Sequence, residues 1–257
     1  MKNRLRTLLR EGGVAVGAWV GMASIEVSEI LANAGFDFLI YDMEHSPLSF
    51  ETVSHLMAAA GSSQVTPLLR VAWNDPVLAK RGLDIGAHGV VFPWVNTAEE
   101  ATRAVQACKY PPEGIRGLAV RRASRYGLDS KEYLATANSE IMVIVQIETL
   151  EAVQHAEAIL SAKGVDAYFV GPSDLSASMG LLGQPEAPAV LAAIEKVLEI
   201  GKNLRIPGGV QPTSVEAANR WIESGFQLIP VGADSSLLMG AAREAIRKIE
   251  RPPLRRR

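Results

Sequence analysis

Two consecutive apolar segments, each ending in an acidic residue, restrict the folds open to this chain. Residues 141–148 are rich in β-branched side chains without polar alternation and end at Glu148, and residues 167–174 end in a Gly-Pro break followed by Asp174. Continuous apolar runs of this length are typical of strands buried on both faces of a parallel sheet. Residues 149–162 have the length of one helix, so both acids are expected at the same carboxyl-terminal edge of the sheet.

The same order of strand, polar turn and helix recurs along almost the whole chain. Strands are expected at residues 14–20, 38–41, 67–71, 89–93, 141–147, 167–170, 208–211 and 228–231. Helices are expected at 24–34, 49–60, 74–85, 97–109, 130–138, 149–162, 187–203, 213–224 and 235–250, with Ser24, Asn74 and Thr97 as N-caps. Residues 110–128, rich in Gly, Pro and Arg, are expected to form a long loop.

Eight such units in 257 residues predict a (β/α)8 TIM barrel, with residues 1–257 as a single domain because no linker interrupts the pattern. A doubly wound open sheet is the alternative fold. No Gly-x-Gly-x-x-Gly motif follows the first expected strand, however, so dinucleotide binding has no support.

The amino-acid composition limits the classes of binding partner and the cellular compartments expected for this protein. A hydrophobic content of 48% predicts a globular chain with a large core, and a net charge of −2 offers no basic footprint for nucleic acid. Apolar runs stay shorter than the roughly 18 residues of a membrane span. Cys108 is the single cysteine, which excludes an internal disulfide and favours a cytoplasmic location. Basic residues at 1–6 could imitate a transit peptide, but leucines at helical spacing favour a short helix.

Polar side chains gather where the expected strands end, at Trp19, Asp42, Glu44, His45, Arg70, Gln146, Glu148, Asp174 and Gln211. Two carboxylates on adjacent strand ends, without a Cys or His cluster, suit an oxygen-ligated cation such as Mg²⁺ or Mn²⁺. Asp174 could alternatively be a helix N-cap. His45 is a candidate general acid or base, and Arg70 either holds a loop or faces an anionic substrate or developing oxyanion.

Five motifs follow one another in the chain: Asp42-Met43-Glu44-His45, residues 110–117 (YPPEGIRG), residues 122–127 (RASRYG), Gln146-Ile147-Glu148-Thr149 and residues 171–180 (GPSDLSASMG). Together they resemble the HpcH/HpaI family of class II pyruvate aldolases. The resemblance implies metal-dependent cleavage of a 4-hydroxy-2-oxo acid into pyruvate and an aldehyde. It assigns a divalent cation (Mg²⁺, Mn²⁺ or Co²⁺) to Glu148 and Asp174, enolate stabilisation to Arg70 and proton transfer to His45. The residues expected to contact substrate are Trp19, Gln146, Ser173, Asp174 and Gln211, with backbone N–H groups around Ser173 and Asp174 holding the substrate carboxylate. Gln211 stands where the family often carries an apolar residue.

The resemblance also implies a homo-oligomer, a hexamer built as a trimer of dimers, with the C-terminal helix exchanged between subunits. Asp84 is the implied partner of His45, yet its place at a helix end puts it toward the opposite face of its own barrel. The two statements agree if Asp84 reaches His45 of a neighbouring subunit. The helix expected at 235–250 would expose Leu237, Leu238, Ile246 and Ile249 at helical spacing.

Other functions stay open at this stage. The same site could perform other enolate chemistry, either oxaloacetate decarboxylation or a citrate-synthase-like condensation. A glycosidase could use Glu148 and Asp174 as acid and nucleophile, and it would need no metal. A non-catalytic barrel that binds a small acid is the third alternative, against which the intact set of acids, Arg70 and His45 argues.

Overall fold

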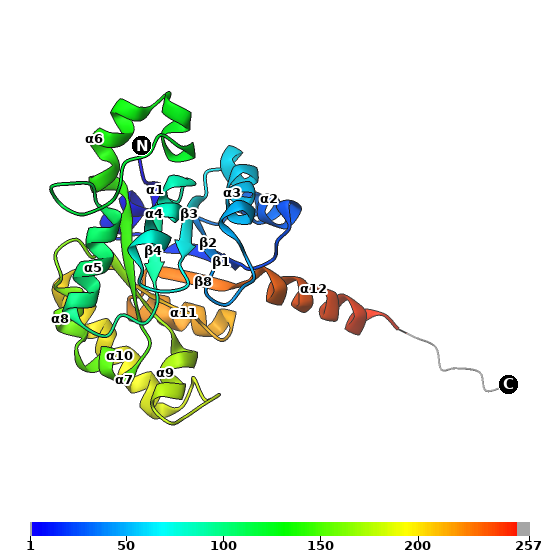
Figure 1. Ribbon diagram of the computed structural model, residues 1–257. Helices are drawn as coiled ribbons and strands as arrows, with labels where there is room; N and C mark the ends of the chain where they lie inside the picture. The colour runs from blue at the N-terminus through cyan, green and yellow to red at the C-terminus, as the bar shows by residue number, and fades with distance from the viewer. Residues whose placement is uncertain (1, 251–257) are drawn as a thin grey trace.

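The computed structural model describes residues 2–250 and contains a closed barrel of parallel strands (Figure 1). The strands are β1 (Ala15–Val20), β2 (Phe38–Asp42), β3 (Thr66–Arg70), β4 (Gly89–Phe92), β5 (Met142–Ile147), β6 (Ala167–Val170), β7 (Gly208–Val210) and β8 (Leu228–Ala233). Each strand pairs with the next one in the chain, and β1 closes the barrel on β8, with Ala15 opposite Leu228. The predicted TIM-barrel fold is therefore confirmed, and the open sheet is excluded.

Helices surround the barrel. They are α1 (Arg4–Arg10), α2 (Ile25–Asn33), α3 (Phe50–Ala59), α4 (Pro76–Asp84), α5 (Ala98–Cys108), α6 (Ser130–Glu140), α7 (Leu150–Gln154), α8 (Ala156–Leu160), α9 (Pro172–Ser178), α10 (Pro188–Leu204), α11 (Val215–Ser224) and α12 (Asp234–Lys248), with short 3-10 turns η1 (Ala60–Ser62) and η2 (Arg122–Gly127). The expected caps Ser24 and Thr97 accept hydrogen bonds from the N–H groups of Val27 and Glu100. η2 lies within the predicted long loop.

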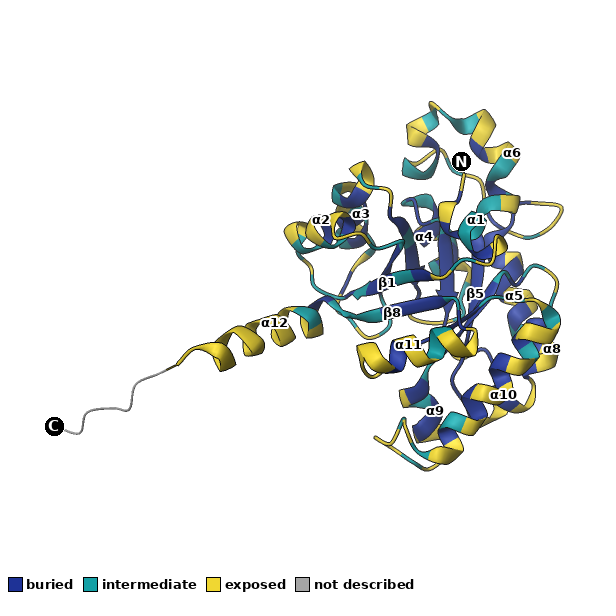
Figure 2. Cartoon of the chain, turned by 180° about the vertical axis from the view of Figure 1, so that it is seen from behind, coloured by how far each residue is buried: buried dark blue, intermediate teal, exposed yellow. Residues whose placement is uncertain are grey.

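Two apolar layers explain why the strands lack polar alternation. Phe38, Ile40 and Phe169 belong to a cluster inside the barrel, whereas the neighbouring residues Leu39 and Tyr41 belong to the cluster between sheet and helices. Because successive side chains on a strand point to opposite faces, both sets must be apolar. Figure 2 shows the strands almost entirely buried.

The first helix closes one end of the inner layer. Leu5 and Leu9 of α1 are buried and pack with the cluster inside the barrel. Asn3 caps this helix, accepting a hydrogen bond from the Arg6 N–H at 3.1 Å. The leucine spacing near the N-terminus thus reports a helix that covers the amino-terminal end of the barrel.

Two expected helix starts were wrong. Asp75, not Asn74, caps α4, because its carboxylate accepts from the N–H groups of Val77 and Leu78 at 2.7 and 3.0 Å. The Asn74 amide instead donates to the carbonyl of Glu100 at 3.0 Å. In the same way, the helix expected from residue 213 begins at Val215 behind the cap Ser214.

The single helix expected at residues 149–162 was also wrong. The structure divides it into α7 and α8 at His155, whose φ of −99° and ψ of 9° interrupt the helix. The Nδ1 atom of His155 lies 3.0 Å from the carbonyl oxygen of Asn96, on the loop after β4. A tertiary contact therefore accompanies the break in an otherwise helical pattern.

The last helix, α12, projects away from the barrel and is largely exposed (Figures 1 and 2). Leu238, Ile246 and Ile249 are exposed as predicted, but Leu237 is half-buried because it packs against the core where α12 begins. Exchange of this helix between subunits stays a prediction. Within residues 2–250, no helix combines the length and the apolar character needed to cross a bilayer.

Candidate active site

Arg70, at the end of β3, is fixed by a bidentate ion pair with Asp42. Its Nε and Nη2 donate to the two carboxylate oxygens of Asp42 at 2.9 and 2.8 Å. The pair forms because the barrel register places Asp42 directly opposite Arg70 on the adjacent strand. The third guanidinium nitrogen of Arg70, Nη1, lies 3.0 Å from Glu44 Oε2 and 3.5 Å from Gln146 Oε1. Asp42 therefore sets the plane of the guanidinium and leaves Nη1 at the strand-end site.

Asp42 also organises the turn that follows β2. Its Oδ1 accepts the N–H groups of Glu44 and His45 at 3.0 and 3.3 Å. Burial alone would raise the pKa of Asp42, but the hydrogen bonds and charge of Arg70, together with these N–H groups, outweigh burial and lower the pKa. An ionised Asp42 thus joins the guanidinium to the segment that carries Glu44 and His45.

Glu148, at the end of β5, is held on both carboxylate oxygens. Its Oε1 accepts the main-chain N–H of Trp94 at 2.7 Å, and its Oε2 accepts from Gln146 Nε2 at 2.5 Å. Gly171 packs so closely that a β-carbon there would lie 2.8 Å from Oε2. Glu148 is 1% exposed, so its carboxylate has little freedom to turn.

Acidic groups repel one another at this mouth of the barrel. Burial raises the pKa of Glu148 to about 7, and the charges of Glu44 and Asp174 add to this rise against the N–H of Trp94 and the charge of Arg70. Burial likewise raises the pKa of Glu44 to about 7, with Asp42 and Asp174 adding to the rise and Arg70 opposing it. The charges of neighbouring carboxylates therefore oppose ionisation of both Glu44 and Glu148.

A divalent cation fits this arrangement. Its charge would relieve the repulsion, and carboxylate oxygens are the ligands that Mg²⁺ and Mn²⁺ prefer. Glu44 Oε2 is buried without a hydrogen-bond partner, since its 3.0 Å contact with Arg70 lacks hydrogen-bond geometry. Across residues 2–250, no group of three or more His, Cys, Asp or Glu side chains is placed to hold a metal ion, so the candidate ligands are the two carboxylates Glu148 and Asp174. Glu148 and Asp174 as ligands would leave coordination positions for substrate oxygens.

Asp174 lies in the first turn of α9, one residue after the exposed Ser173. Its interpretation as a helix N-cap was wrong, because the cap position of α9 is Gly171 and no side chain caps the helix there. The half-buried carboxylate faces the charges of Glu44 and Glu148 instead.

Trp19 and Gln211 form one unit above Arg70. The indole Nε1 of Trp19 donates to Gln211 Oε1 at 2.6 Å, and Gln211 Nε2 donates to the carbonyl of Pro212 at 3.1 Å. The guanidinium carbon of Arg70 lies 4.3 Å from the centre of the Trp19 ring, a cation–π contact. Phe169 meets the same ring edge-on at 5.7 Å. Gln211 thus orients Trp19, and Trp19 covers the guanidinium.

His45 and Asp84 have different ion-pair partners in the described part of this chain. His45 is exposed, with Nε2 3.8 Å from Glu44 Oε2. Asp84, at the carboxyl end of α4 and hence near the amino-terminal face of the barrel, pairs with the buried Arg116 at 3.0 Å. The structure therefore gathers the other predicted site residues at one mouth and places Asp84 elsewhere, as its position at a helix end predicts.

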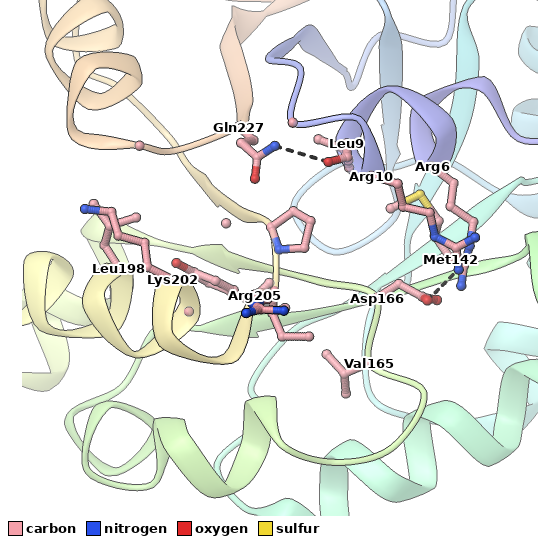
Figure 3. Close-up of a pocket in the computed structure, with 17 residues that line it drawn as sticks. Arg6, Leu9, Arg10, Met142, Val165, Asp166, Leu198, Lys202, Arg205 and Gln227 are labelled. Carbon is pink, nitrogen blue, oxygen red and sulfur yellow. Dashed lines mark hydrogen bonds and ion pairs between the residues drawn. The ribbon is translucent and has the colours of Figure 1, made fainter.

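A separate cavity of about 530 Å³ opens near the amino ends of β6, β7 and β8 (Figure 3). Arg6 and Asp166 form an ion pair of 2.6 Å in its wall, and Gln227 donates to the carbonyl of Leu9 at 3.3 Å. None of the predicted site residues lines this cavity. It is therefore distinct from the candidate active site.

A family model described as HpcH/HpaI aldolase/citrate lyase matches residues 15–241. The chain belongs to this family. It is 42% identical over 245 residues to the 4-hydroxy-2-oxo-heptane-1,7-dioate aldolase of Escherichia coli, covering 94% of this chain and 93% of that protein. These two findings show that this member of the HpcH/HpaI family is an enzyme of the aldolase class, a carbon–carbon lyase.

Solved structures of the HpcH/HpaI family have the same fold. The chain superposes on an HpcH/HpaI aldolase/citrate lyase family protein from Burkholderia cenocepacia J2315 with a TM-score of 0.93 and 38% identity, covering 96% of this chain and 99% of that one. It is also similar to the citrate synthase SbnG, with a TM-score of 0.86 and 27% identity over 95% of this chain and 96% of the other.

Sequence patterns alone missed three contributions to this HpcH/HpaI site. Asp42 and Glu44 were placed at the strand ends without a role, although Arg70 touches both. Trp94 was not a candidate at all, because its contribution is a main-chain N–H that reaches Glu148. No residue-type pattern could identify a backbone donor. The motif spacing around Asp42 could have identified the other two.

Proposed function

We propose that the protein is a metal-dependent aldolase that cleaves a 4-hydroxy-2-oxo acid, such as 4-hydroxy-2-oxoheptanedioate or a 2-keto-3-deoxy sugar acid, into pyruvate and an aldehyde. The observation that carries the proposal is the convergence of Glu44, Glu148 and Asp174 beside the guanidinium of Arg70. The E. coli relative, named for its cleavage of 4-hydroxy-2-oxoheptanedioate, supports the substrate class.

Glu148 and Asp174 would hold the divalent cation, Mg²⁺, Mn²⁺ or Co²⁺. When bound, such an ion supplies Lewis-acid polarisation of the 2-oxo group. Gln146, which donates to Glu148 and lies against Arg70, would orient the substrate's oxo acid end, together with Ser173 and the first turn of α9.

Arg70 would stabilise charge on the oxo oxygen as it becomes an enolate. Cleavage breaks the C3–C4 bond: the 4-hydroxyl loses its proton, the C4–O group becomes the aldehyde, and the bonding electrons pass to the pyruvate fragment. Nη1 of Arg70, beside Glu44 and Gln146, is the nitrogen available for this contact, since Nε and Nη2 bind Asp42. A fixed donor needs no reorganisation as the charge develops.

His45 would take the 4-hydroxyl proton and return a proton to C3, which completes pyruvate. Its exposed position lets a substrate or a water reach the ring. Asp84 would set its tautomer from a neighbouring subunit, because the Asp84 of the same chain lies near the opposite end of the barrel.

Removal of the cation tests the proposal. Exhaustive chelation should abolish pyruvate release, measured by coupling to lactate dehydrogenase, and Mg²⁺, Mn²⁺ or Co²⁺ should restore it. Glu148→Gln should lose metal affinity, whereas Arg70→Ala should keep the metal and lose kcat by about 10²- to 10³-fold. Full activity of the metal-free enzyme, or a substrate adduct trapped by borohydride, would disprove the mechanism.

The active protein is proposed to be a cytoplasmic homohexamer, a trimer of dimers that exchange α12. The exposed apolar residues Leu238 and Ile246 of the projecting helix, together with Ile249 directly after it, support this assembly (Figure 1). Inactive His45→Ala and Asp84→Asn subunits should regain activity when mixed, because hybrids contain sites with both groups intact. No recovery despite subunit exchange, demonstrated by tagged subunits, would show that the site is not shared.

Citrate-synthase-like condensation is the second candidate, supported by the similarity to SbnG at a TM-score of 0.86. The same Arg70 and cation would stabilise an enolate derived from oxaloacetate. Turnover of oxaloacetate with a carbonyl acceptor, without cleavage of any 4-hydroxy-2-oxo acid in a substrate screen, would select this alternative.

A further inference from the structure

Trp94 adopts a backbone conformation that aromatic residues rarely occupy. Its φ of 54° lies in the left-handed region, which glycine enters without cost and which is unfavourable for bulky side chains. Such conformations persist only where the surrounding structure enforces them, and they concentrate at functional sites.

The segments on both sides of Trp94 are anchored. Before it, Phe92 ends β4 and is fully buried, and after it Val95 is also buried. Asn96 is held by three groups: its N–H donates to Glu100 at 2.7 Å, its side-chain oxygen accepts from Thr149 at 2.5 Å, and its carbonyl lies 3.0 Å from His155 Nδ1. Residue 94 therefore takes its left-handed conformation between two anchored segments.

In this left-handed conformation the N–H of residue 94 points into the candidate active site. This N–H donates to Glu148 Oε1 at 2.7 Å, while Gln146 and Gly171 restrain Oε2. A change of residue 94 to a negative φ would rotate its peptide groups relative to one another and withdraw this donor. The carboxylate would then be held from one side only.

We propose that Trp94 is a positioning residue, whose main-chain N–H, directed by the left-handed backbone conformation, holds Glu148 in the orientation that binds the divalent cation. This inference rests on the proposed metal role of Glu148. Its distinctive consequence is that the backbone preference of residue 94, and not the size or polarity of its side chain, controls metal affinity.

Three substitutions separate backbone from side chain. Trp94→Gly, Trp94→Ala and Trp94→Val all retain the N–H and all remove the indole, but glycine favours positive φ, alanine tolerates it and β-branched valine opposes it. We expect Mn²⁺ dissociation constants, measured by titration calorimetry, to follow this order. Trp94→Gly should bind at least as tightly as the original protein, and Trp94→Val about 10-fold more weakly.

Trp73 supplies the matched control. It is exposed beyond the end of the neighbouring strand β3, and its φ is not positive. The same three substitutions at Trp73 should leave the Mn²⁺ dissociation constant unchanged. Thermal unfolding of each metal-free variant, recorded in parallel, ensures that affinities are compared between folded proteins.

Equal weakening by all three Trp94 substitutions would assign the effect to the lost indole and overturn the inference. A melting temperature that falls in the glycine-to-valine order without a change in Mn²⁺ affinity would also overturn it, because it would show a purely structural role. If Trp94→Val does not fold, the Mn²⁺ affinities of Trp94→Gly, Trp94→Ala, Trp94→Asn and Trp94→Thr replace its result. The inference would be overturned if all four variants bound Mn²⁺ as tightly as the original protein. Failure of the original protein to bind Mn²⁺ would refute the proposed function itself.

Discussion

Replacing Asp42 by Asn should separate the structural and catalytic effects of the Asp42–Arg70 pair. The substitution keeps the shape of the side chain and one oxygen, but it places an amide NH₂ group against a guanidinium that already donates at 2.9 and 2.8 Å. Both side chains are about nine-tenths buried. Removing one charge of a buried pair costs about 3 to 5 kcal/mol, and we expect the lower end because one acceptor remains.

A loss of about 3 kcal/mol should lower the melting temperature by about 6 to 12 °C in a chain of this size. Catalysis should fall further than stability alone explains, because Asp42 sets the guanidinium plane and the turn that carries His45. Loss of one oriented donor corresponds to about 10²- to 10³-fold in kcat. Steady-state pyruvate release at a temperature where the variant is folded measures this effect.

Asp166→Asn is the matched control. Asp166 pairs with Arg6 at 2.6 Å, with side-chain exposures of 11% and 13%, near the opposite end of the barrel (Figure 3). Asp166→Asn should lower the free energy of unfolding by about as much as Asp42→Asn does, but it should leave kcat nearly unchanged. If Asp42→Asn retained normal kcat, or if both variants lost activity equally, the role of Asp42 in orienting Arg70 would be refuted.

Three further outcomes are expected. Gly171→Ala should weaken Mn²⁺ binding about 10-fold, because its β-carbon would lie 2.8 Å from Glu148 Oε2. Gly240→Ala is the control and should leave Mn²⁺ affinity unchanged, because, among the described residues, no atom beyond its own turn of helix lies near the added β-carbon. Equal Mn²⁺ affinities of the two variants would contradict the close packing of Gly171 against Glu148. Metal affinity should fall by up to about 10-fold per pH unit below pH 7, since a proton competes for Glu148 with its pKa of about 7, and a pH-independent dissociation constant between pH 5 and 7 would argue against this. Burial lowers the pKa of His88 to about 4, so the unfolded chain binds a proton below pH 6.5 that the folded protein excludes. Urea unfolding at pH 7 and pH 4.5 measures how much the free energy of unfolding falls on acidification. This fall should be about 2.5 kcal/mol smaller in His88→Gln than in the original protein. Identical falls in the two proteins would show that His88 is not responsible.

Periodicity and strand-end chemistry were sufficient to predict the fold and to place most of the candidate site residues at one mouth of the barrel. The uninterrupted apolar strands follow from burial on both faces, which is a property of each strand taken alone. The carboxylates Glu148 and Asp174 could be assigned to one mouth because parallel connections bring all carboxyl ends to the same side. Ser24 and Thr97 were recognised as caps for an equally local reason, since a cap contacts its own first helical turn.

The tertiary structure decided how these groups are connected. Asn74 and the helix expected at 149–162 were misjudged because Glu100 and Asn96, distant in the chain, provide hydrogen-bond partners that no local pattern contains. Arg70 could be placed at a strand end, but its commitment of two nitrogens to Asp42 depends on the register between β2 and β3. The N–H of Trp94 reaches Glu148 across 54 residues of sequence because β4 and β5 are neighbours in the barrel. Amino-acid type and spacing report local conformation and burial, whereas hydrogen-bond partners are chosen by distance and direction, which exist only after the strands have closed into a ring.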